Sequence, residues 1–391
     1  MVARTPGEFH EKQNIDVRIR HEVLAIDPNQ QRVQVQNLET AKQSWEPYDQ
    51  LMVATGAVPI CPQVPGADAE GIYGADSLKT AMRINEIIDR KQPKRAVIVG
   101  GGYIGLEMAE ALILRGLTVS LVEQADEVMN TLDPDMGALV SKALEETGVA
   151  LYRQESLQGF DHSENGVRAV ITDQREIPAD MVILGMGVRP NTDLAKEAGI
   201  PLGAKDAIKV NSRMQTDVEN IWSAGDCVES FHLVSKKPFY VALGTVANKQ
   251  GRVAGINIGG GKATFPGAVG TAISKICQVG VARTGLQVKE IEQLDLDYAD
   301  ARIESKTRAG YYPGAEDITV KVLAEKRSGR LLGGQIVGKG DGAKRIDVLA
   351  TALHAGFNVQ EMIHLDLSYA PPFSPVWDPV LIAVRQIIKK I

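Results

Sequence analysis

A run of glycines between an apolar strand and an apolar helix is the strongest chemical signal in the sequence. The strand residues 95–99 lead directly into Gly100-Gly101-Gly102-Tyr103-Ile104-Gly105. This spacing, G-x-G-x-x-G, suits a diphosphate at a helix N-terminus. One glycine makes the tight turn, one lets the diphosphate approach the backbone, and one lets the helix pack closely on the strand. The run predicts a dinucleotide-binding turn.

An acidic residue stands where such a turn needs it. Glu123 ends the next apolar strand, 118–123, and lies 18 residues after Gly105. A carboxylate there can accept hydrogen bonds from both ribose hydroxyls of an adenosine, and it repels a 2′-phosphate. We therefore predict NADH rather than NADPH. The alternative is that the glycines serve only close packing and that Glu123 is a solvated strand end.

Three weaker turns also follow apolar strands. They are Ala54-Thr55-Gly56, the stretch GVRPN that begins at Gly187, and the stretch SAGD that ends at Asp226. A helix of small residues, 241–255, follows the last of them. Taken singly, each is an ordinary strand-to-loop turn, and Asp226 could be a helix cap. Their order along the chain is what carries information.

The cysteines and histidines do not form a metal site or a disulfide framework. Cys61, Cys227 and Cys277 are widely spaced, and the six histidines have no ligand spacing. We expect all three cysteines to be buried as small apolar residues. Cys227 needs the closest inspection because it follows Asp226. This cysteine usage predicts a reducing, cytoplasmic setting.

The size and composition set the frame for these motifs. A chain of 391 residues suits two or three domains. With 44% hydrophobic and 24% charged residues it has the composition of a globular protein. The net charge of −6 predicts no general attraction to nucleic acid or to anionic lipid. No apolar run reaches the roughly 18 residues of a membrane span, and none at the start looks like a secretory signal.

The elements that must position the motifs follow from periodicity. The first 50 residues or so alternate polar and apolar and predict a small sheet, and the Pro-rich segment 58–67 predicts an irregular linker. Strands and helices then alternate through 77–148, which predicts a parallel sheet with helices on both faces. A hairpin around 173–176 and a last strand follow. The part from about 265 onward predicts a separate α+β domain.

This order of motifs resembles the pyridine nucleotide-disulfide oxidoreductases, which are two-dinucleotide flavoproteins. The resemblance implies an α/β fold: a Rossmann-like NAD domain inserted in an FAD domain, followed by a C-terminal α+β dimerisation domain. The implied ranges are 1–75 (first FAD part and linker), 76–198 (NAD(P)H domain), 199–260 (second FAD part) and 261–391 (dimerisation domain).

The same resemblance implies roles for single residues. Ala54, Thr55, Gly56 and Asp226 would bind FAD, Gly187 would mark the return from the NAD domain, and Ala247 lies on the helix expected near the flavin. Tyr103 resembles the aromatic gate over the nicotinamide position, and Glu107 resembles the family carboxylate beside it. For Tyr103, the alternative is a helix residue that only packs.

The C-terminal tail narrows the resemblance to one branch. Residues 367–379, LSYAPPFSPVWDP, resemble the coenzyme A disulfide reductases, NADH oxidases and peroxidases, and persulfide or polysulfide reductases. The branch implies a homodimer in which Tyr369, with Tyr311 or Tyr312, reaches the partner's thiol site. It also implies hydride transfer from NADH to FAD and on to a small thiol or disulfide, such as coenzyme A disulfide or a persulfide. The tail aromatics could instead build only an apolar dimer contact.

One part of the family pattern has no counterpart in this sequence. The family begins with its own glycine fingerprint for FAD and a redox cysteine, a region of about 60–70 residues. We therefore expect an FAD-dependent NADH oxidoreductase of the coenzyme A disulfide reductase type, represented by an N-terminally incomplete chain. NADH oxidase, peroxidase and persulfide reductase activities on the same scaffold stay open. A hypothesis of another class is a non-catalytic NADH-binding remnant.

Overall fold

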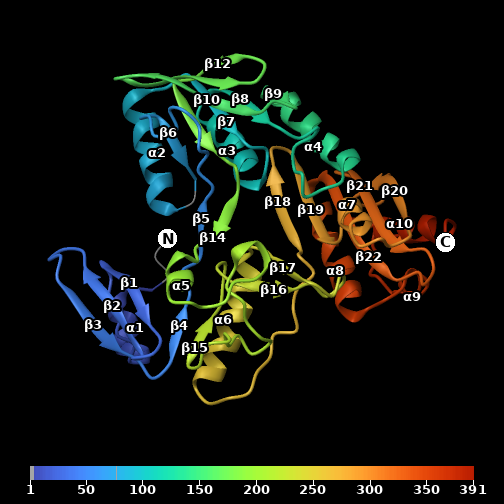
Figure 1. Cartoon of the computed structure of the whole chain (residues 1–391). Coiled ribbons are helices and arrows are strands. Elements are labelled where there is room, and N and C mark those ends of the chain that lie inside the picture. Colours follow the sequence, from blue (N-terminus) through green and yellow to red (C-terminus); the bar gives the residue numbers. More distant parts are fainter. Residues whose placement is uncertain (1–3, 76) are drawn as a thin grey trace. The chain divides into compact units, whose positions relative to one another are not determined.

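The computed structural model describes residues 4–75 and 77–391 (Figure 1). Its internal contacts divide the chain into two compact units, and each unit is built from separate stretches of sequence. The smaller unit consists of the described residues up to Ala57, Pro190–Ser230 and Pro238–Pro266. The larger unit consists of Val58–Arg189, Phe231–Lys237 and Gly267–Ile391. The four ranges predicted from the sequence remain a proposed division within these units.

The smaller unit begins with the predicted small sheet, which is confirmed. A capped helix, α1 (Pro6–Gln13), precedes three antiparallel strands, β1 (His21–Asp27), β2 (Arg32–Asn37) and β3 (Gln43–Pro47). Two short strands then pair in parallel, β4 (Leu51–Val53) and β15 (Ile221–Ser223). The remaining elements are α5 (Asp193–Glu197), η1 (Ala204–Asp206), β16 (Glu229–Phe231), β17 (Pro238–Tyr240) and α6 (Gly244–Ile258).

The larger unit contains the predicted parallel sheet. Its strand order is β6-β13-β7-β8-β9, and every neighbouring pair is parallel. The strands are β6 (Ile72–Gly74), β13 (Met181–Leu184), β7 (Arg95–Val99), β8 (Thr118–Glu123) and β9 (Ala150–Arg153). Its helices are α2 (Leu78–Lys91), α3 (Tyr103–Leu114) and α4 (Pro134–Glu146).

The two faces of this sheet are covered differently, which corrects the prediction of helices on both. Side chains alternate along β7, so Ala96 and Ile98 join a core with α2, α3 and α4. Val97 and Val99 point the other way and pack with Phe160 and Ile177. Those residues belong to an antiparallel sheet of β10 (Leu157–Ser163), β11 (Gly166–Thr172) and β12 (Glu176–Pro178) (Figure 1).

The Pro-rich segment 58–67 is not wholly irregular, which is a second correction. Its first residues form β5 (Ala57–Pro59), which pairs with β14 (Val188–Pro190). The Ile60 N–H donates to the Gly187 carbonyl at 3.0 Å and continues this pairing. Pro59 is tolerated because it lies at the end of a two-stranded ladder, where a missing N–H costs little.

The C-terminal part of the larger unit is the predicted α+β arrangement. Five antiparallel strands follow the order β18-β19-β22-β21-β20. They are β18 (Ala272–Ile276), β19 (Val279–Gly285), β20 (Tyr298–Lys306), β21 (Asp317–Glu325) and β22 (Leu331–Lys339). Around them lie α7 (Val288–Glu292), η2 (Gly340–Arg345), α8 (Ile346–Ala355), α9 (Val359–Met362) and α10 (Pro379–Ile388). No helix within the described residues is long and apolar enough to cross a membrane.

Candidate functional site

The glycine-rich turn lies between β7 and α3, and its glycines differ in what surrounds them. Gly100 has φ +101°, and a Cβ there would lie 2.6 Å from the Gly185 carbonyl oxygen. At Gly105 a Cβ would lie 2.0 Å from the Gly100 carbonyl oxygen, so only glycine lets the helix approach the strand. At Gly102 the nearest protein atom would be 3.8 Å away, which leaves room for a ligand against the backbone.

The first turn of α3 is open to an anion. Its N-cap is Gly102, and no side chain among the described residues caps this end of the twelve-residue helix. Its first amides and the positive end of its dipole are therefore available to a diphosphate. Tyr103 and Ile104 begin the helix at this point. The geometry fits the dinucleotide predicted for the turn.

Glu123 is not the solvated strand end considered as the alternative. It is 8% exposed, and its carboxylate is held by two backbone amides. Oε2 accepts from the Gly101 N–H at 2.7 Å, and Oε1 accepts from the Ala125 N–H at 2.9 Å. A carboxylate offers about four lone-pair positions. Acceptor capacity for two ribose hydroxyls therefore remains beside the turn.

A pocket of about 610 Å³ opens beyond the end of β8, and the sequence did not reveal it. Its two arginines are already paired. Arg153 Nη1 lies 2.8 Å from a Glu127 carboxylate oxygen, and Arg175 Nε lies 2.9 Å from Glu155 Oε1. Both guanidiniums of this pocket are thus engaged by carboxylates of the chain, and the choice of NADH over NADPH stays a prediction. The only sequence signal was the run of charged residues after the strand.

The hydroxyl of Tyr103 is buried next to the hydroxyl of Thr131. In the described part of the chain, neither hydroxyl has a hydrogen-bond partner. Burial raises the pKa of Tyr103, while the Thr131 hydroxyl and the positive charge of Arg283 act to lower it. The phenol is therefore protonated at neutral pH. Its assignment as a nicotinamide gate remains a prediction.

Glu107, also predicted for the nicotinamide site, has a hydrogen-bond partner in the C-terminal sheet. Glu107, one turn along α3, accepts a hydrogen bond from Ser274 Oγ of β18 at 2.5 Å. The carboxylate is thus engaged by the C-terminal sheet. A role beside the nicotinamide stays a prediction for Glu107.

In the smaller unit, the predicted flavin-binding turns come together at the ends of β4 and β15. Ser223 Oγ donates to the Val53 carbonyl at 2.8 Å, which brings Ala54 beside Ala224. The Thr55 hydroxyl donates to the Asn191 carbonyl at 2.5 Å, and the Asn191 N–H donates to Gly56 at 2.9 Å. The turn at Ala54–Gly56 is therefore a neighbour of two turns that lie more than 130 residues later in the sequence. Gly187 belongs to the larger unit, where it accepts from Ile60.

Asp226 has an unfilled hydrogen-bonding position. Its Oδ1 is buried and finds no partner among the residues that the structure describes, and burial raises the pKa of this carboxyl. No helix begins after it before α6, so the helix-cap alternative is wrong. The neighbouring Gly225 N–H donates to Gln250 Oε1 of α6 at 3.0 Å, and a Cβ on Gly225 would lie 4.0 Å from that of Ala247. A buried acceptor of this kind fits a ligand hydroxyl, such as one on the ribityl chain of FAD.

The tyrosines predicted from the tail lie in the C-terminal part of the larger unit. Tyr311 is the main cause of a raised pKa at Tyr369, so the two phenols interact. Both are exposed, at 46% and 78%. Tyr312 is also at the surface. Phe373 and Trp377 of the tail are exposed nearby in sequence, so polar and apolar groups share this surface.

The cysteines match the prediction only in part. Cys227 is fully buried, with Sγ 3.6 Å from the Ala224 carbonyl oxygen, and Cys277 is 3% exposed. Cys277 lies in the turn between β18 and β19, with φ +52°, rather than in a strand. Cys61 is exposed, so the prediction of burial is wrong there. The reason is that the Pro-rich segment containing it lies on the surface.

These features are the ones expected of an oxidoreductase that binds two dinucleotides. They are the glycine turn before the uncapped helix α3, Glu123 at the end of β8, and the buried, unpaired oxygen of Asp226. Comparison with known families agrees. Residues 3–251 match the model described as pyridine nucleotide-disulphide oxidoreductase, and residues 271–379 match the dimerisation domain of that family. The chain belongs to the pyridine nucleotide-disulphide oxidoreductase family.

Several relatives are similar over nearly the whole chain. The NAD(P)H coenzyme A polysulfide/persulfide reductase of Pyrococcus horikoshii is 38% identical over 381 residues, covering 97% of this chain and 84% of the relative. The coenzyme A disulfide reductase of Staphylococcus haemolyticus is 31% identical, covering 95% and 82%. The structure of an NAD-dependent persulfide reductase from A. fulgidus has a TM-score of 0.96 at 38% identity, covering 99% and 72%.

These matches confirm the predicted fold class and the predicted class of enzyme. The chain is an FAD-dependent NAD(P)H oxidoreductase of this family, and its C-terminal part is a dimerisation domain. The family binds both dinucleotides, in agreement with the two sets of strand-end turns described above.

Proposed function

We propose that this protein uses NADH to reduce a sulfur–sulfur bond attached to coenzyme A, in a disulfide or a persulfide. The proposal further assigns the NADH site to the turn at Gly100–Gly105 and Glu123, and the FAD site to Ala54–Gly56 and Asp226. Relatives named for coenzyme A disulfide and for coenzyme A persulfide support the substrate class.

The observation that carries the substrate proposal is a pair of exposed, interacting tyrosines on the dimerisation domain, Tyr311 and Tyr369. Two phenols side by side can donate hydrogen bonds to a thiolate as it leaves a sulfur–sulfur bond. The raised pKa of Tyr369 keeps it protonated and able to donate at neutral pH. Because both rings are exposed, they can face a second subunit. We assign the pair to the partner's sulfur site in a homodimer.

In the two proposed dinucleotide sites, each residue of the chain has a separate binding or positioning role. FAD held by Ala54–Gly56 and Asp226 would supply the redox chemistry between NADH and the sulfur–sulfur bond. Glu123 orients the adenosine ribose, and the open end of α3 holds the diphosphate. Tyr103 covers the nicotinamide position. Asp226 accepts a hydrogen bond from a ribityl hydroxyl, which fills its buried acceptor.

The test is NADH consumption by the FAD-loaded protein with three acceptors: coenzyme A disulfide, coenzyme A persulfide and oxygen. Release of coenzyme A thiol is measured in parallel. Tyr369→Phe and Tyr311→Phe should lower kcat with the coenzyme A acceptor by about tenfold or more. Tyr312→Phe is the matched control, and it should have the smallest effect.

The outcomes separate the remaining candidates. Turnover with oxygen alone would make the protein an NADH oxidase, the second candidate function. NADH binding without turnover on any acceptor would favour the non-catalytic remnant. Equal losses in all three tyrosine variants would remove the special role of the pair Tyr311 and Tyr369.

The proposed setting is the cytoplasm. All three cysteines are free thiols. Free thiols, one of them exposed, persist in a reducing compartment. Fractionation of the source cells with an antibody to the chain tests this, and recovery in an oxidising compartment would contradict it.

A further inference from the structure

The loop between β8 and α4, residues 124–133, packs against the glycine-rich turn and is hydrogen-bonded to it. The Met129 N–H donates to the Gly101 carbonyl at 2.8 Å. Val128 packs so closely that its Cγ1 would lie 2.8 Å from a Cβ on Gly101. Both side chains are buried, each 1% exposed. The conformation of the second glycine of the turn therefore depends on the position of this loop.

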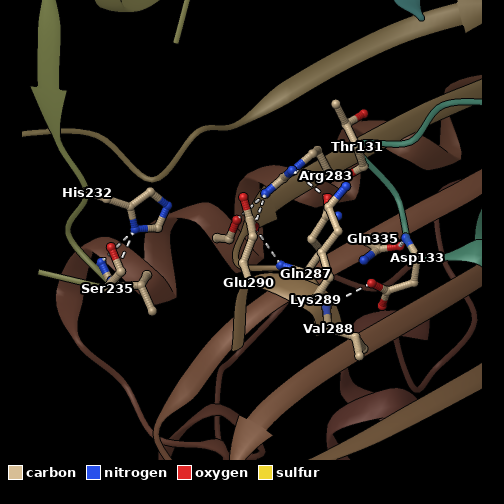
Figure 2. Close-up of polar contacts among 12 residues, drawn as sticks. Thr131, Asp133, His232, Ser235, Arg283, Gln287, Val288, Lys289, Glu290 and Gln335 are labelled. Atoms are coloured by element: carbon tan, nitrogen blue, oxygen red, sulfur yellow. Dashed lines mark hydrogen bonds and ion pairs between the residues drawn. The ribbon is translucent and has the colours of Figure 1, made fainter. Parts of the chain in front are cut away.

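The other side of the loop is held by β19 and by the start of α7, and Figure 2 shows Arg283, Gln287 and Lys289 of these elements. Arg283 Nη1, from β19, donates to the Thr131 carbonyl at 3.0 Å. The Asn130 carbonyl accepts from Gln287 Nε2 at 3.3 Å and from Lys289 Nζ at 2.9 Å. Two successive carbonyls of the loop are thus bound by side chains located about 150 residues later in the sequence.

The end of the loop is fixed in the same way. The Asp133 N–H donates to Gln335 Oε1 at 2.8 Å, and Asp133 Oδ1 accepts from the Val288 N–H at 2.8 Å. Asp133 Oδ2 lies 3.0 Å from Lys321 Nζ, with side chains 2% and 6% exposed. Breaking such a buried pair by removing one partner is strongly destabilising. Asp133 therefore ties the start of α4 firmly to the C-terminal sheet.

Arg283 is the member of this set that contacts the Thr131 carbonyl. Its side chain is 13% exposed, and its charge influences the pKa of Tyr103. The guanidinium also donates to the Gly285 carbonyl, to Gln287 Oε1 at 3.1 Å and to Glu290 Oε2 at 3.2 Å. With these partners the guanidinium plane is already oriented toward Thr131.

We propose that Arg283 is a positioning residue for the NADH site, acting through the loop 124–133. Arg283 donates a hydrogen bond to the Thr131 carbonyl, and Met129 of the same loop donates one to the Gly101 carbonyl. The turn is thereby kept in a conformation in which its amides can bind the diphosphate. This inference rests on the proposed NADH site at Gly100–Gly105. Its consequence is that the dimerisation domain helps to set the affinity for the nucleotide.

The physical reason is preorganisation. Without Arg283, the Thr131 carbonyl and the Glu290 carboxylate lose a buried donor, and the loop is held less firmly. Binding of the diphosphate must then also order the turn, and ordering lowers the affinity. The effect should appear in the dissociation constant of NADH whether or not flavin is bound.

The experiment compares two buried arginines of the same domain. Arg345 is 15% exposed, with Nε 2.7 Å from Asp378 Oδ2 and Nη2 2.8 Å from the Thr307 carbonyl. It thus resembles Arg283 in having a carboxylate and a carbonyl partner, but it does not contact the loop. Arg283→Met and Arg345→Met are titrated with NADH by calorimetry, and melting temperatures are measured for both.

Arg283→Met should weaken NADH binding by about tenfold, as expected for loss of about 1.4 kcal/mol. Arg345→Met should lower the melting temperature but leave the dissociation constant within about twofold of wild type. Arg283→Lys, which keeps the charge and can still reach a carbonyl, should fall between. It also serves if Arg283→Met does not fold. ADP-ribose should lose as much affinity as NADH, because the loop supports the diphosphate position.

Three results would overturn the inference. They are an unchanged dissociation constant in both Arg283 variants, an equal loss in Arg345→Met, and a loss for NADH without one for ADP-ribose. Failure of the wild-type protein to bind NADH at all would instead contradict the proposed function.

Discussion

Glu123 ends one parallel strand and Asp226 follows another, yet the protein gives their carboxylates different hydrogen-bond partners. Glu123 receives two backbone N–H groups, at 2.7 and 2.9 Å. Asp226 has a buried oxygen without a partner in the described chain, and burial raises its pKa. Buried polar atoms are rarely left unpaired unless a ligand supplies the partner. The carboxylate of the proposed NADH site is therefore already bound by the protein, whereas that of the proposed flavin site would gain its partner from the ligand.

The largest effect should come from the glycine that packs helix against strand. Gly105→Ala places a Cβ 2.0 Å from the Gly100 carbonyl oxygen, and backbone atoms cannot move aside cheaply. We expect a loss of about 3 kcal/mol or more in the free energy of unfolding, which lowers the melting temperature by about 6–12 °C. NADH binding should be lost. Calorimetry and thermal melts check both.

Gly102→Ala is the matched control for that substitution. Its Cβ would be 3.8 Å from the nearest protein atom, so the melting temperature should stay at the wild-type value. NADH affinity should still fall by about tenfold or more, because the methyl group occupies the approach of the diphosphate. A wild-type melting temperature for Gly105→Ala would contradict the packing argument.

Glu123→Gln should destabilise the fold as well as weaken NADH binding. The amide can accept from only one of the two N–H groups, and its own N–H₂ faces the other. We expect the free energy of unfolding to fall by about 2 kcal/mol, measured as a lower denaturant midpoint at an unchanged slope. NADH should bind more weakly, and the preference over NADPH should shrink. An unaltered midpoint would mean that the two amide contacts contribute little.

Asp226→Asn should have the opposite effect on the flavin-free protein. Removing a charge from a position that disfavours it should leave the free energy of unfolding equal or higher, by up to about 1 kcal/mol after allowing for solvent screening. Retention of FAD during purification should fall, because the ribityl hydroxyl loses its charged acceptor. Flavin content per chain, read from absorbance, is the measurement. If the flavin-free variant were less stable than wild type, Asp226 would stabilise the fold as Glu123 does, which contradicts the prediction.

The smallest expected effect is a pH dependence of the difference in unfolding free energy between Asp226→Asn and wild type. Because the pKa of Asp226 is higher in the folded protein, its favourable contribution is present below its ordinary pKa of 3.8. It is lost as pH rises through the folded value. The stability gap between Asp226→Asn and wild type should therefore be near zero in acid and widen toward neutral pH. Denaturant midpoints across that range test the sign, and a gap that narrows would reverse it.

The sequence predicts the turn more fully than the surroundings of the turn. The glycine spacing and Glu123 are local signals, and the structure gives Gly100, Gly102 and Gly105 the expected environments. Side-chain alternation in β7 indicates burial on both faces but not what covers each face. The predicted hairpin around residues 173–176 is confirmed as β11 and β12. That its sheet, with Phe160, covers one face of the parallel sheet was not predicted, and a second layer of helices was expected there.

The set of contacts around Arg283 shows a different limit. A charged residue in the otherwise apolar segment VGVARTG is the only local sign of a special position. Its partner Thr131 lies 152 residues earlier, in a loop with no regular pattern. Contacts between a strand and a distant loop depend on tertiary packing, which periodicity within one segment does not report. Cys61 was wrongly predicted to be buried because its Pro-rich segment lies on the surface.

The pairing of β4 with β15 has a consequence for how the chain is made. Val53 and Ser223, which join these strands, are separated by 170 positions. At roughly 5–20 residues per second, β4 leaves the ribosome about 10–30 s before its partner exists. During that interval the strand edge beside Ala54–Gly56 has no partner from β15. The N-terminal part of the smaller unit therefore cannot complete its packing until residues Pro190–Ser230 have been synthesised.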